Sequence, residues 1–586
     1  MPRLLKMFMP AFLAAPLSAT EPARKREWQP VQEYITTIDP KDEERKGMGK
    51  EQRINPFLSY TAIGTDYGFL GPDASVLAWS PHHIHVRLTD GQWAGIWHSL
   101  TKRGMDADAM LDFQRCYPPW IADAFQPRIT GIKLRGHGTG KIKVEIKTAN
   151  QEVIWSDGGM VENKQDDIEA YRELPRLGRA KYLNWIASTD SELSVDMIGL
   201  EVEMPARPFD MEVFLKSYAK LSICYSMKSG LVADRAHIET GAFDCVPASG
   251  MFCLATAAAA EHGITGKEFA LTVLRRVHEA VTRLEAPLGV LPHFIRQIDG
   301  RYRIHPGTEY STVDTAIYYH SMLLAAQMLG DAGTLQAVLR DMRRLDFKQL
   351  RDAEGYIFHG LKEDGSPLAG TWRDWGGETA LVLLLQRAVA GADAPALMHK
   401  DGKVWQGTGF IPEIQSLFYP QFDSKEADRV SGRIWPETRG ALLKRQMQYF
   451  AGAKGSVDRA YGLSAGEASR GRGYLVSGVD LPSQEVIHPH YILMSSGMVE
   501  KPGDVYSLLQ KLEDCGYFPP VGLAENIHMT TGEQLPMLGS LNASFEAIAA
   551  CHLLARHRAQ PDPIYTAAKN CALLNEAITW LFPPSP

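Results

Sequence analysis

Two kinds of hydrophobic pattern divide the chain, and the first is typical of β-strands. In the segment KIKVEIK (141–147), apolar and charged residues alternate, which is the period of a half-buried strand. The glycine-rich segment GHGTG (136–140) predicts a turn that joins this strand to an earlier one at 129–135. A further alternating stretch covers 193–204. Strands separated by Gly and Asp turns are typical of antiparallel sandwiches, so we predict a β-sandwich accessory domain over 30–205.

The second pattern begins after Pro205 and Pro208, where apolar residues recur at helical spacing. The predicted helices cover 209–227, 249–262, 267–284, 311–329, 332–346, 373–390, 410–428, 436–453, 488–498, 502–515, 539–557 and 563–581. Thr265 and Glu268 have the spacing of a capping box at the start of the third helix. Twelve helices favour six stacked pairs, closed into an (α/α)6 toroid over 208–584. The long connections of such a ring are where a binding site is expected.

Composition narrows the class of protein. Hydrophobic residues make up 45% of the 586 and charged residues 22%, which is ordinary for a globular protein with a large core. The net charge of −7 and the lack of a long Lys/Arg run argue against nucleic acid as a partner. No stretch reaches the roughly 20 apolar residues that cross a bilayer, so no membrane span is predicted.

The first residues, 1–19, have the pattern of a signal peptide. Arg3 and Lys6 precede an apolar stretch at 7–17, and small residues follow at the predicted cleavage site. This pattern predicts a periplasmic or secreted protein. The seven cysteines form no CxxC pair, and their odd number argues mildly for a reducing compartment. A cytoplasmic location therefore stays open as the alternative.

Carboxylates and aromatic residues gather in and beside the long connections between helices. Sugar rings stack on aromatic side chains and bind carboxylates through their hydroxyl groups. Hydrolysis of a glycosidic bond needs one protonated and one ionised carboxyl group. The candidate residues are Asp234, Arg235, Glu309, Asp314, Trp372, Asp374, Trp375, Glu378, Glu467, Glu525 and Asn526. A carboxylate at a helix start is often only a cap or an N-terminal charge, which would also explain Asp314 and Asp374.

Glu378 is the strongest candidate for the protonated carboxyl group. It follows the turn WRDWGG (372–377) and precedes the apolar run 381–385. Burial between tryptophans and an apolar helix would raise the pKa of a carboxyl group. We therefore expect Glu378 to act as a general acid.

Four segments occur in a fixed order along the helical part: SGLVADR (229–235), EYSTVDTA (309–316), WRDWGGETALVLLL (372–385) and YGLSAGEASRGRGY (461–474). Together with a weaker fifth, EVIHPHYILMSSG (485–497), they resemble the glucoamylase-like glycoside hydrolases that include bacterial endo-β-1,2-glucanases (glycoside hydrolase family 144). The resemblance implies an (α/α)6 barrel, an inverting mechanism, an oligo- or polysaccharide substrate, and no metal or other cofactor. It places the family's glutamate before the apolar helix on Glu378, its Val-Asp-Thr-Ala aspartate on Asp314, and a substrate contact on His488.

The late segments depart from the family pattern. The family has an aspartate three residues before an asparagine, whereas the acid nearest to Asn526 is its neighbour Glu525. The family's Glu-Asn-Tyr-Arg segment is replaced by LNASFE (541–546). We therefore predict Glu525 as the general base, with Asp314 and Glu467 as alternatives. The sugar and the linkage stay open, with a β-1,2-glucan or a related bacterial polysaccharide expected.

Parts of the sequence also suggest a polysaccharide lyase, a non-catalytic protein or a metal site. His490 and Tyr491 would suit proton abstraction in a polysaccharide lyase, but the candidate loops are acidic, whereas a lyase that binds uronates needs Arg and Lys. A toroid without its acid–base pair would be a non-catalytic glycan-binding or polysaccharide assembly protein. His488 and His490 form an HPH segment, but no third ligand has a matching spacing, so no metal site is predicted. The N-terminal domain is expected to support the catalytic domain and not to catalyse.

Overall fold

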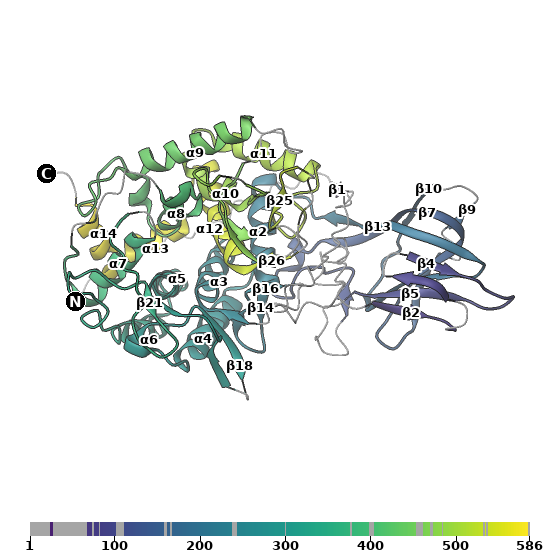
Figure 1. Cartoon of the computed structure of the whole chain (residues 1–586), viewed down its shortest axis with the longest axis horizontal. Helices are drawn as coiled ribbons and strands as arrows, with labels where there is room; N and C mark the ends of the chain where they lie inside the picture. Colours follow the sequence, from purple (N-terminus) through teal and green to yellow (C-terminus); the bar gives the residue numbers. More distant parts are fainter. Residues whose placement is uncertain are drawn as a thin grey trace, which may run out of the picture.

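The computed structural model places a β-rich N-terminal part beside a helical part (Figure 1). The described residues are 24–26, 67–72, 76–80, 83–100, 110–157, 161–163, 167–236, 243–298, 301–375, 378–395, 397, 404–452, 461–468, 473–482, 484–530, 532, 534 and 537–583. The predicted signal peptide (1–19) and residues 30–66 of the predicted sandwich domain lie outside the described residues.

The N-terminal part is built on antiparallel strands. Its largest sheet has the order β2-β5-β12-β7-β13-β4-β3, and four short strands pair at the sides of β7 and β13. The strands are β1 (Arg24–Arg26), β2 (Tyr67–Leu70), β3 (Val76–Ser80), β4 (His83–Val86), β5 (Ala94–Ser99), β6 (Leu111–Asp112), β7 (Arg128–Lys147), β8 (Val153–Ser156), β9 (Val161–Asn163), β10 (Asp167–Glu173), β11 (Arg179–Ala180), β12 (Tyr182–Ala187) and β13 (Ser191–Met204). Every pairing recorded among these strands is antiparallel, as the alternating pattern predicts.

Strand β7 runs without a break through GHGTG, so the turn predicted at 136–140 is wrong. Its first half pairs with β13 and β10, and its second half with β12, β8 and β9. Gly138 and Gly140 have φ angles of 136° and 127°, which L side chains rarely adopt. At Gly140 an added Cβ would also lie 2.1 Å from the Ser191 hydroxyl. The glycines therefore allow the two halves of one long strand to pair with different strands. In the sequence, such a glycine-rich segment looks like a turn.

The helical part begins with α2 and ends with α14 (Figure 1). Its helices are α2 (Phe209–Cys224), α3 (Val246–Glu261), α4 (Lys267–Thr282), α5 (Thr312–Leu329), α6 (Ala332–Met342), α7 (Thr379–Ala390), α8 (Phe410–Glu413), α9 (Trp435–Gly452), α10 (His490–Met494), α11 (Pro502–Asp514), α12 (Ser540–His557), α13 (Pro563–Asn570) and α14 (Ala572–Leu581), with 3-10 turns η6 (Ile414–Leu417), η7 (Pro420–Asp423) and η9 (Ser495–Met498) among them. Within the described residues, none of these helices is both long and apolar enough to cross a membrane.

Short antiparallel strand pairs connect the helices. They are formed by β14 (Tyr225–Ser226), β15 (Leu231–Val232), β16 (Arg235–Ala236), β17 (Asp244–Cys245), β18 (Phe294–Ile298), β19 (Arg301–Ile304), β20 (Tyr310–Ser311), β21 (Gly360–Leu361), β22 (Ala465–Glu467), β23 (Tyr474–Val476), β24 (Val486–Ile487), β25 (Ile527–His528) and β26 (Leu538–Gly539). Several of these pairs join segments that are far apart in sequence, as β16 does with β26. The long connections are therefore held in place by backbone hydrogen bonds, although their sequences show no strand alternation.

Two predicted helices are broken in the structure. The helix predicted at 563–581 is interrupted at Cys571, where α13 ends and α14 begins. Short helical turns replace the helix predicted at 410–428, because Pro420 lacks the backbone N–H that a continuous helix needs and holds Tyr419 before it in an extended conformation.

Hydrogen bonds join the N-terminal part to the helical part. The Tyr117 hydroxyl donates to the Pro520 carbonyl at 2.5 Å, and the Thr265 hydroxyl donates to the Trp120 carbonyl at 2.7 Å. The second bond explains why the predicted capping box is wrong. Thr265 uses its hydroxyl outside the helix, and Gly266 is the N-cap of α4 without any side-chain bond.

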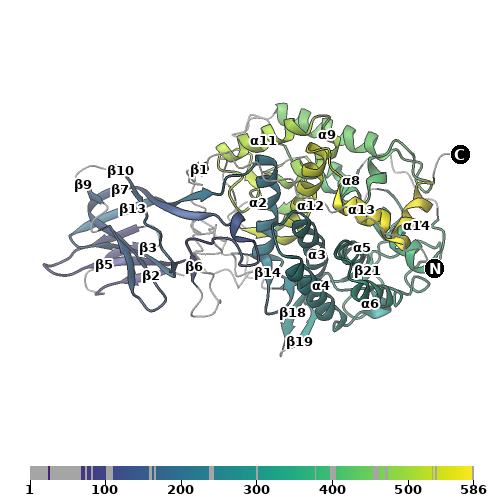
Figure 2. The same cartoon turned by 180° about the vertical axis from the view of Figure 1, so that it is seen from behind.

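Small residues let the central helices pack closely. In α3, an added Cβ at Gly250 would lie 3.0 Å from the Cα of Tyr318 in α5. Helix α12 packs against α2 and α3, and Figure 2 shows the three side by side. The helix starts and loops that carry the predicted site residues are therefore attached to one tightly packed body.

Candidate active site

Two strand pairs bring distant predicted site residues together. The pairing of β16 with β26 sets Arg235 beside Gly539, and the pairing of β22 with β23 sets Glu467 opposite Tyr474. Arg235 Nη2 lies 3.0 Å from Glu467 Oε2, and Arg235 Nε lies 3.3 Å from Asp234 Oδ2. One guanidinium group therefore holds two carboxylates that lie far apart in the sequence.

The acids around Arg235 have raised pKa values. Desolvation raises the pKa of Glu467 to about 7; the attraction of Arg235 opposes this, and the charges of Glu525 and Asp234 add to it. The pKa of Asp234 is also raised, mainly by desolvation and with a contribution from Glu525. Groups that exchange protons near neutral pH are typical of sites that carry out acid–base chemistry.

Glu525 is 2% exposed and is fixed by two donors. Asn542 Nδ2 donates to Oε1 at 2.7 Å, and the backbone N–H of Gly539 donates to Oε2 at 3.3 Å. Both donors belong to the start of α12. Asn542 lies in LNASFE, so the segment that departs from the family pattern supplies a partner for the predicted base.

A buried ion pair holds the loop that carries Glu525. Lys220 Nζ donates to the Leu523 carbonyl at 2.7 Å and to Glu546 at 2.9 Å, and Glu546 accepts from the Leu523 N–H at 2.8 Å. Both charged side chains are almost completely buried. The neighbouring Gly522 has a φ of 83°, and an added Cβ there would lie 2.6 Å from Glu546. Sequence analysis did not identify this Lys220–Glu546 pair, because charged residues in a helix are usually solvated.

Asn526 and His488 are fully buried, and their predicted contacts with a substrate stay predictions. Asn526 Nδ2 donates to the carbonyls of Glu467 and Ala468 at 2.6 and 3.1 Å. His488 Nε2 lies 3.3 Å from the Glu467 carbonyl. Both side chains fasten the hairpin formed by β22 and β23, which is a structural role that the motif alone did not reveal.

A second group of charges surrounds His293, which sequence analysis missed. His293 Nδ1 lies 3.2 Å from Glu309 Oε1 and 3.5 Å from Asp314 Oδ2. Desolvation lowers the pKa of His293, but the charge of Asp314 and hydrogen bonds to Cys245 and Glu309 raise it well above its usual value. The hydrogen bond from His293 in turn lowers the pKa of Glu309. His293 therefore contacts two carboxylates, and the charge of Asp314 favours its protonated form.

The same three side chains have a spacing that a metal ion could use, because their ligand atoms lie within 4.8 Å of one another. The same atoms could contact one another as ion pairs or bind a cation, so the absence of a metal stays a prediction.

Glu378 stands at the entrance of α7. The helix predicted at 373–390 begins only at Thr379, whose hydroxyl donates to the Asp374 carbonyl at 2.7 Å. Glu378 occupies the N-cap position, but its side chain makes no capping hydrogen bond. Desolvation raises the pKa of Glu378 to about 7, and the negative charge of Asp314 contributes to this shift. Helix capping therefore does not explain why a glutamate occupies this position.

The two tryptophans before α7 differ in their surroundings. Trp375 is 3% exposed, its ring lies 4.6 Å from that of Trp435, and the Arg433 guanidinium lies 4.1 Å from its centre. Other side chains cover the ring in this structure, and its predicted role as a substrate-binding residue stays a prediction. Trp372 is only partly buried, and its Nε1 donates to the Thr312 hydroxyl at 2.9 Å.

The two groups of charges belong to one site. The pKa of Asp234 is lowered by the charge of His293 and raised by that of Glu525, so Asp234 links the two groups. Glu378 is coupled to Asp314 in the same way. We call this cluster the acidic site. It consists of Asp234, Arg235, His293, Glu309, Asp314, Glu378, Glu467 and Glu525.

We expect Glu378→Gln to stabilise the folded protein at alkaline pH. A carboxyl group with a pKa of about 7 in the folded state and 4.5 in the unfolded state binds more protons when folded. Its contribution to the free energy of unfolding therefore falls as the pH rises through this interval, and glutamine avoids the loss. Urea unfolding at pH 8 should show the variant more stable by on the order of 1–3 kcal/mol, with little difference near pH 4. The same difference at both pH values would contradict the raised pKa.

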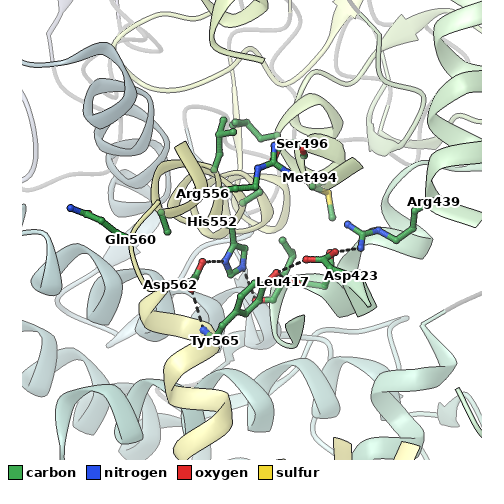
Figure 3. A pocket seen from close by; sticks show the side chains of 16 residues that line it. Leu417, Asp423, Arg439, Met494, Ser496, His552, Arg556, Gln560, Asp562 and Tyr565 are labelled. Atoms are coloured by element: carbon green, nitrogen blue, oxygen red, sulfur yellow. Dashed lines mark hydrogen bonds and ion pairs between the residues drawn. The ribbon is translucent and has the colours of Figure 1, made fainter. Parts of the chain in front are cut away.

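A cavity of about 220 Å³ lies away from the acidic site, between η6, η9 and the second half of α12 (Figure 3). Charged side chains that line it pair with one another: Arg439 with Asp423, and His552 with Asp562 at 2.6 Å. Arg556 donates to backbone carbonyls. No residue of the acidic site lines this cavity, so we do not assign the chemistry to it.

Known structures share the fold, whereas no protein-family profile and no curated protein sequence matches the chain. An endo-β-1,2-glucanase from Chitinophaga pinensis, solved with sophorotriose and glucose, matches 64% of this chain and 99% of its own with a TM-score of 0.53 and 12% identity. A β-1,2-glucanase from Parabacteroides distasonis matches 89% of this chain and 96% of its own (TM-score 0.52, 11% identity). A candidate glucoamylase from Bacteroides caccae ATCC 43185 matches 64% and 99% (TM-score 0.52, 15% identity).

The predicted relation to glucoamylase-like proteins and endo-β-1,2-glucanases is therefore confirmed at the level of the fold. The match to the Parabacteroides distasonis protein extends beyond the helical part, so the shared arrangement includes N-terminal strands. At identities of 11–15%, these likenesses describe the fold alone.

Proposed function

We propose that this protein is a glycoside hydrolase that cleaves a glucan, with β-1,2-glucan as the first candidate. The proposal includes an (α/α)6 catalytic toroid and an N-terminal β-sandwich that supports it. The observation that carries the proposal is the carboxyl group of Glu378. It makes no capping hydrogen bond, and its pKa is raised to about 7, in part by the charge of Asp314. The glucanases among the structures of the same fold make a glucan the first substrate to test.

Glu378 is the proposed general acid. A pKa of about 7 keeps a large fraction of the carboxyl group protonated at neutral pH, and a general acid works best when its pKa lies near the working pH. The proton would pass to the oxygen of the bond that breaks. The negative charge of Asp314 favours the protonated form before the reaction and opposes the ionised form after it.

Glu525 is the proposed general base. Asn542 and the Gly539 N–H orient its two oxygens without bringing a positive charge to them. Among the predicted alternatives, Glu467 is bound to Arg235 and Asp314 to His293, whereas the two donors to Glu525 are uncharged. In an inverting hydrolase, the base activates a water molecule on the opposite face of the sugar from the acid.

The two residues predicted for the polysaccharide lyase alternative are poorly placed for that reaction. His490 and Tyr491 are buried, and His490 Nε2 lies 3.0 Å from the Ser464 hydroxyl. Neither side chain can abstract a proton from a substrate in this position. The acidic site also contains one arginine among its acids, whereas a lyase that binds uronates needs several cations.

Cleavage of a panel of purified glucans tests the proposal. We expect new reducing ends from at least one β-linked glucan, and proton NMR of the first products should show an inverted anomeric centre. Retained configuration would contradict the inverting mechanism. Unsaturated products would identify a lyase, and binding without cleavage would identify a non-catalytic glycan-binding protein.

A further inference from the structure

Tyr474 has an unusual position in the acidic site. Its side chain is 60% exposed, whereas Glu467, its partner in the hairpin register, is 2% exposed. Within the described residues, no side chain or backbone group exchanges a hydrogen bond with its hydroxyl. Much of the ring is therefore open to solvent.

The exposed ring is nevertheless within electrostatic range of the acids of the site, and its register partner Glu467 is one of them. Desolvation and the negative charges of four carboxylates raise the pKa of the Tyr474 phenol above its usual value; these are Glu378, Asp314, Glu525 and Asp234. Tyr474 is thus coupled both to the proposed acid and to the proposed base.

The backbone around Tyr474 is fixed from both sides of the hairpin. The Ala468 N–H donates to the Gly473 carbonyl at 2.8 Å, which closes the ladder next to Tyr474. On the opposite strand, Arg235 binds the Glu467 carboxylate, and Asn526 binds the Glu467 carbonyl. The backbone position of Tyr474 is therefore set in advance by its neighbours, as a rigid binding surface requires.

Exposure alone would not single out this tyrosine, because soluble proteins expose many apolar atoms. Tyr171 on β10 is 43% exposed, lies in the N-terminal part, and donates its hydroxyl to Glu201 at 3.0 Å. Tyr474 differs in its open hydroxyl and in its place among carboxylates. Carboxylates accept hydrogen bonds from sugar hydroxyls, whereas a flat aromatic face packs against the C–H groups of a sugar ring.

We propose that Tyr474 is the platform on which one sugar ring of the substrate stacks, so that the adjoining glycosidic bond lies between Glu378 and Glu525. This inference rests on the proposed glycoside hydrolase function. The ring supplies contact area and orientation, and the surrounding acids bind the hydroxyl rim of the same sugar. Tyr474 is then a binding residue that places the scissile bond, and its hydroxyl takes no part in proton transfer.

Binding and kinetics of four variants test the platform, with any glucan that the wild type cleaves. Tyr474→Ala should raise the KM by roughly tenfold or more, because it removes most of the apolar area under the sugar. Tyr474→Leu keeps apolar bulk without a flat face and should be almost as impaired. Tyr474→Phe keeps the ring and should show a smaller effect, about threefold or less. Tyr171→Ala is the matched control and should behave like the wild type. Titration calorimetry in a Glu378→Gln background gives the Kd without turnover.

The possible results separate this inference from the proposed function. Wild-type KM and Kd in Tyr474→Ala would overturn the platform, while the hydrolase assignment would stand. A Tyr474→Phe variant that binds normally but loses turnover as strongly as Tyr474→Ala would show that the hydroxyl acts, and would also overturn it. Failure of the wild type to cleave any glucan would refute the proposed function and the platform with it.

Discussion

Replacing Glu378 with glutamine should lower the turnover of a cleavable glucan by at least about a hundredfold and leave glycan binding intact. Glutamine keeps the shape of the side chain but cannot give a proton to the leaving oxygen. The side chain at this position makes no capping bond to α7, so the start of the helix loses no hydrogen bond. Steady-state kinetics give kcat, and titration calorimetry gives the Kd.

A matched control is Glu268→Gln. Glu268 lies in the first turn of α4 and is exposed, so this variant removes a helix-start carboxylate outside the acidic site. It should keep wild-type kinetics. Near-normal turnover in Glu378→Gln would exclude Glu378 as the general acid. Loss of binding together with turnover would show that its main role is to contact the substrate.

Replacing Lys220 with methionine should lower the free energy of unfolding by about 3–5 kcal/mol, the usual cost of removing one partner of a buried ion pair. The variant leaves Glu546 without its cation, and desolvation already raises the pKa of this glutamate. The Leu523 carbonyl also loses a donor at 2.7 Å. Urea unfolding measures the change, with the slope of the transition as a check on cooperativity.

Two further variants sharpen this test. Lys220→Met combined with Glu546→Gln removes both charges and should recover part of the lost stability, because no unpaired charge stays buried. Arg283→Met breaks an exposed pair between Arg283 and Glu279 and should cost no more than about 0.5 kcal/mol. A cost for Lys220→Met as small as that of Arg283→Met would show that the buried pair does not hold the Glu525 loop.

Periodicity and motif order predicted much of the structure. Helical spacing located most of the helices, because an apolar stripe at that spacing has to face a core. The carboxylates of Asp234, Asp314, Glu378, Glu467 and Glu525 were predicted as site residues, and charges among them shift one another's pKa values.

Side-chain contacts that form only when the chain folds could not be predicted from the sequence. His293 has an ordinary sequence context, and its importance comes from Glu309 and Asp314 at 3.2 and 3.5 Å. Whether a polar residue faces a substrate or the backbone behind it also depends on tertiary packing, as Asn526 and Trp375 show. Sequence patterns report which residues are polar or aromatic, but they do not report which neighbours cover them.

The timing of folding follows from the bonds that hold the Glu525 loop. Leu523 is bound by Lys220, 303 positions earlier, and Pro520 by Tyr117, 403 positions earlier. Such long-range contacts form late, because the intervening chain has to be ordered before its ends can meet. On the ribosome, a chain that stops before Glu546 has its N-terminal strands and most of its helices, yet it lacks the residue that completes the loop. We therefore expect the Glu525 loop to take its final position only after Glu546 has been synthesised, later than the N-terminal strands.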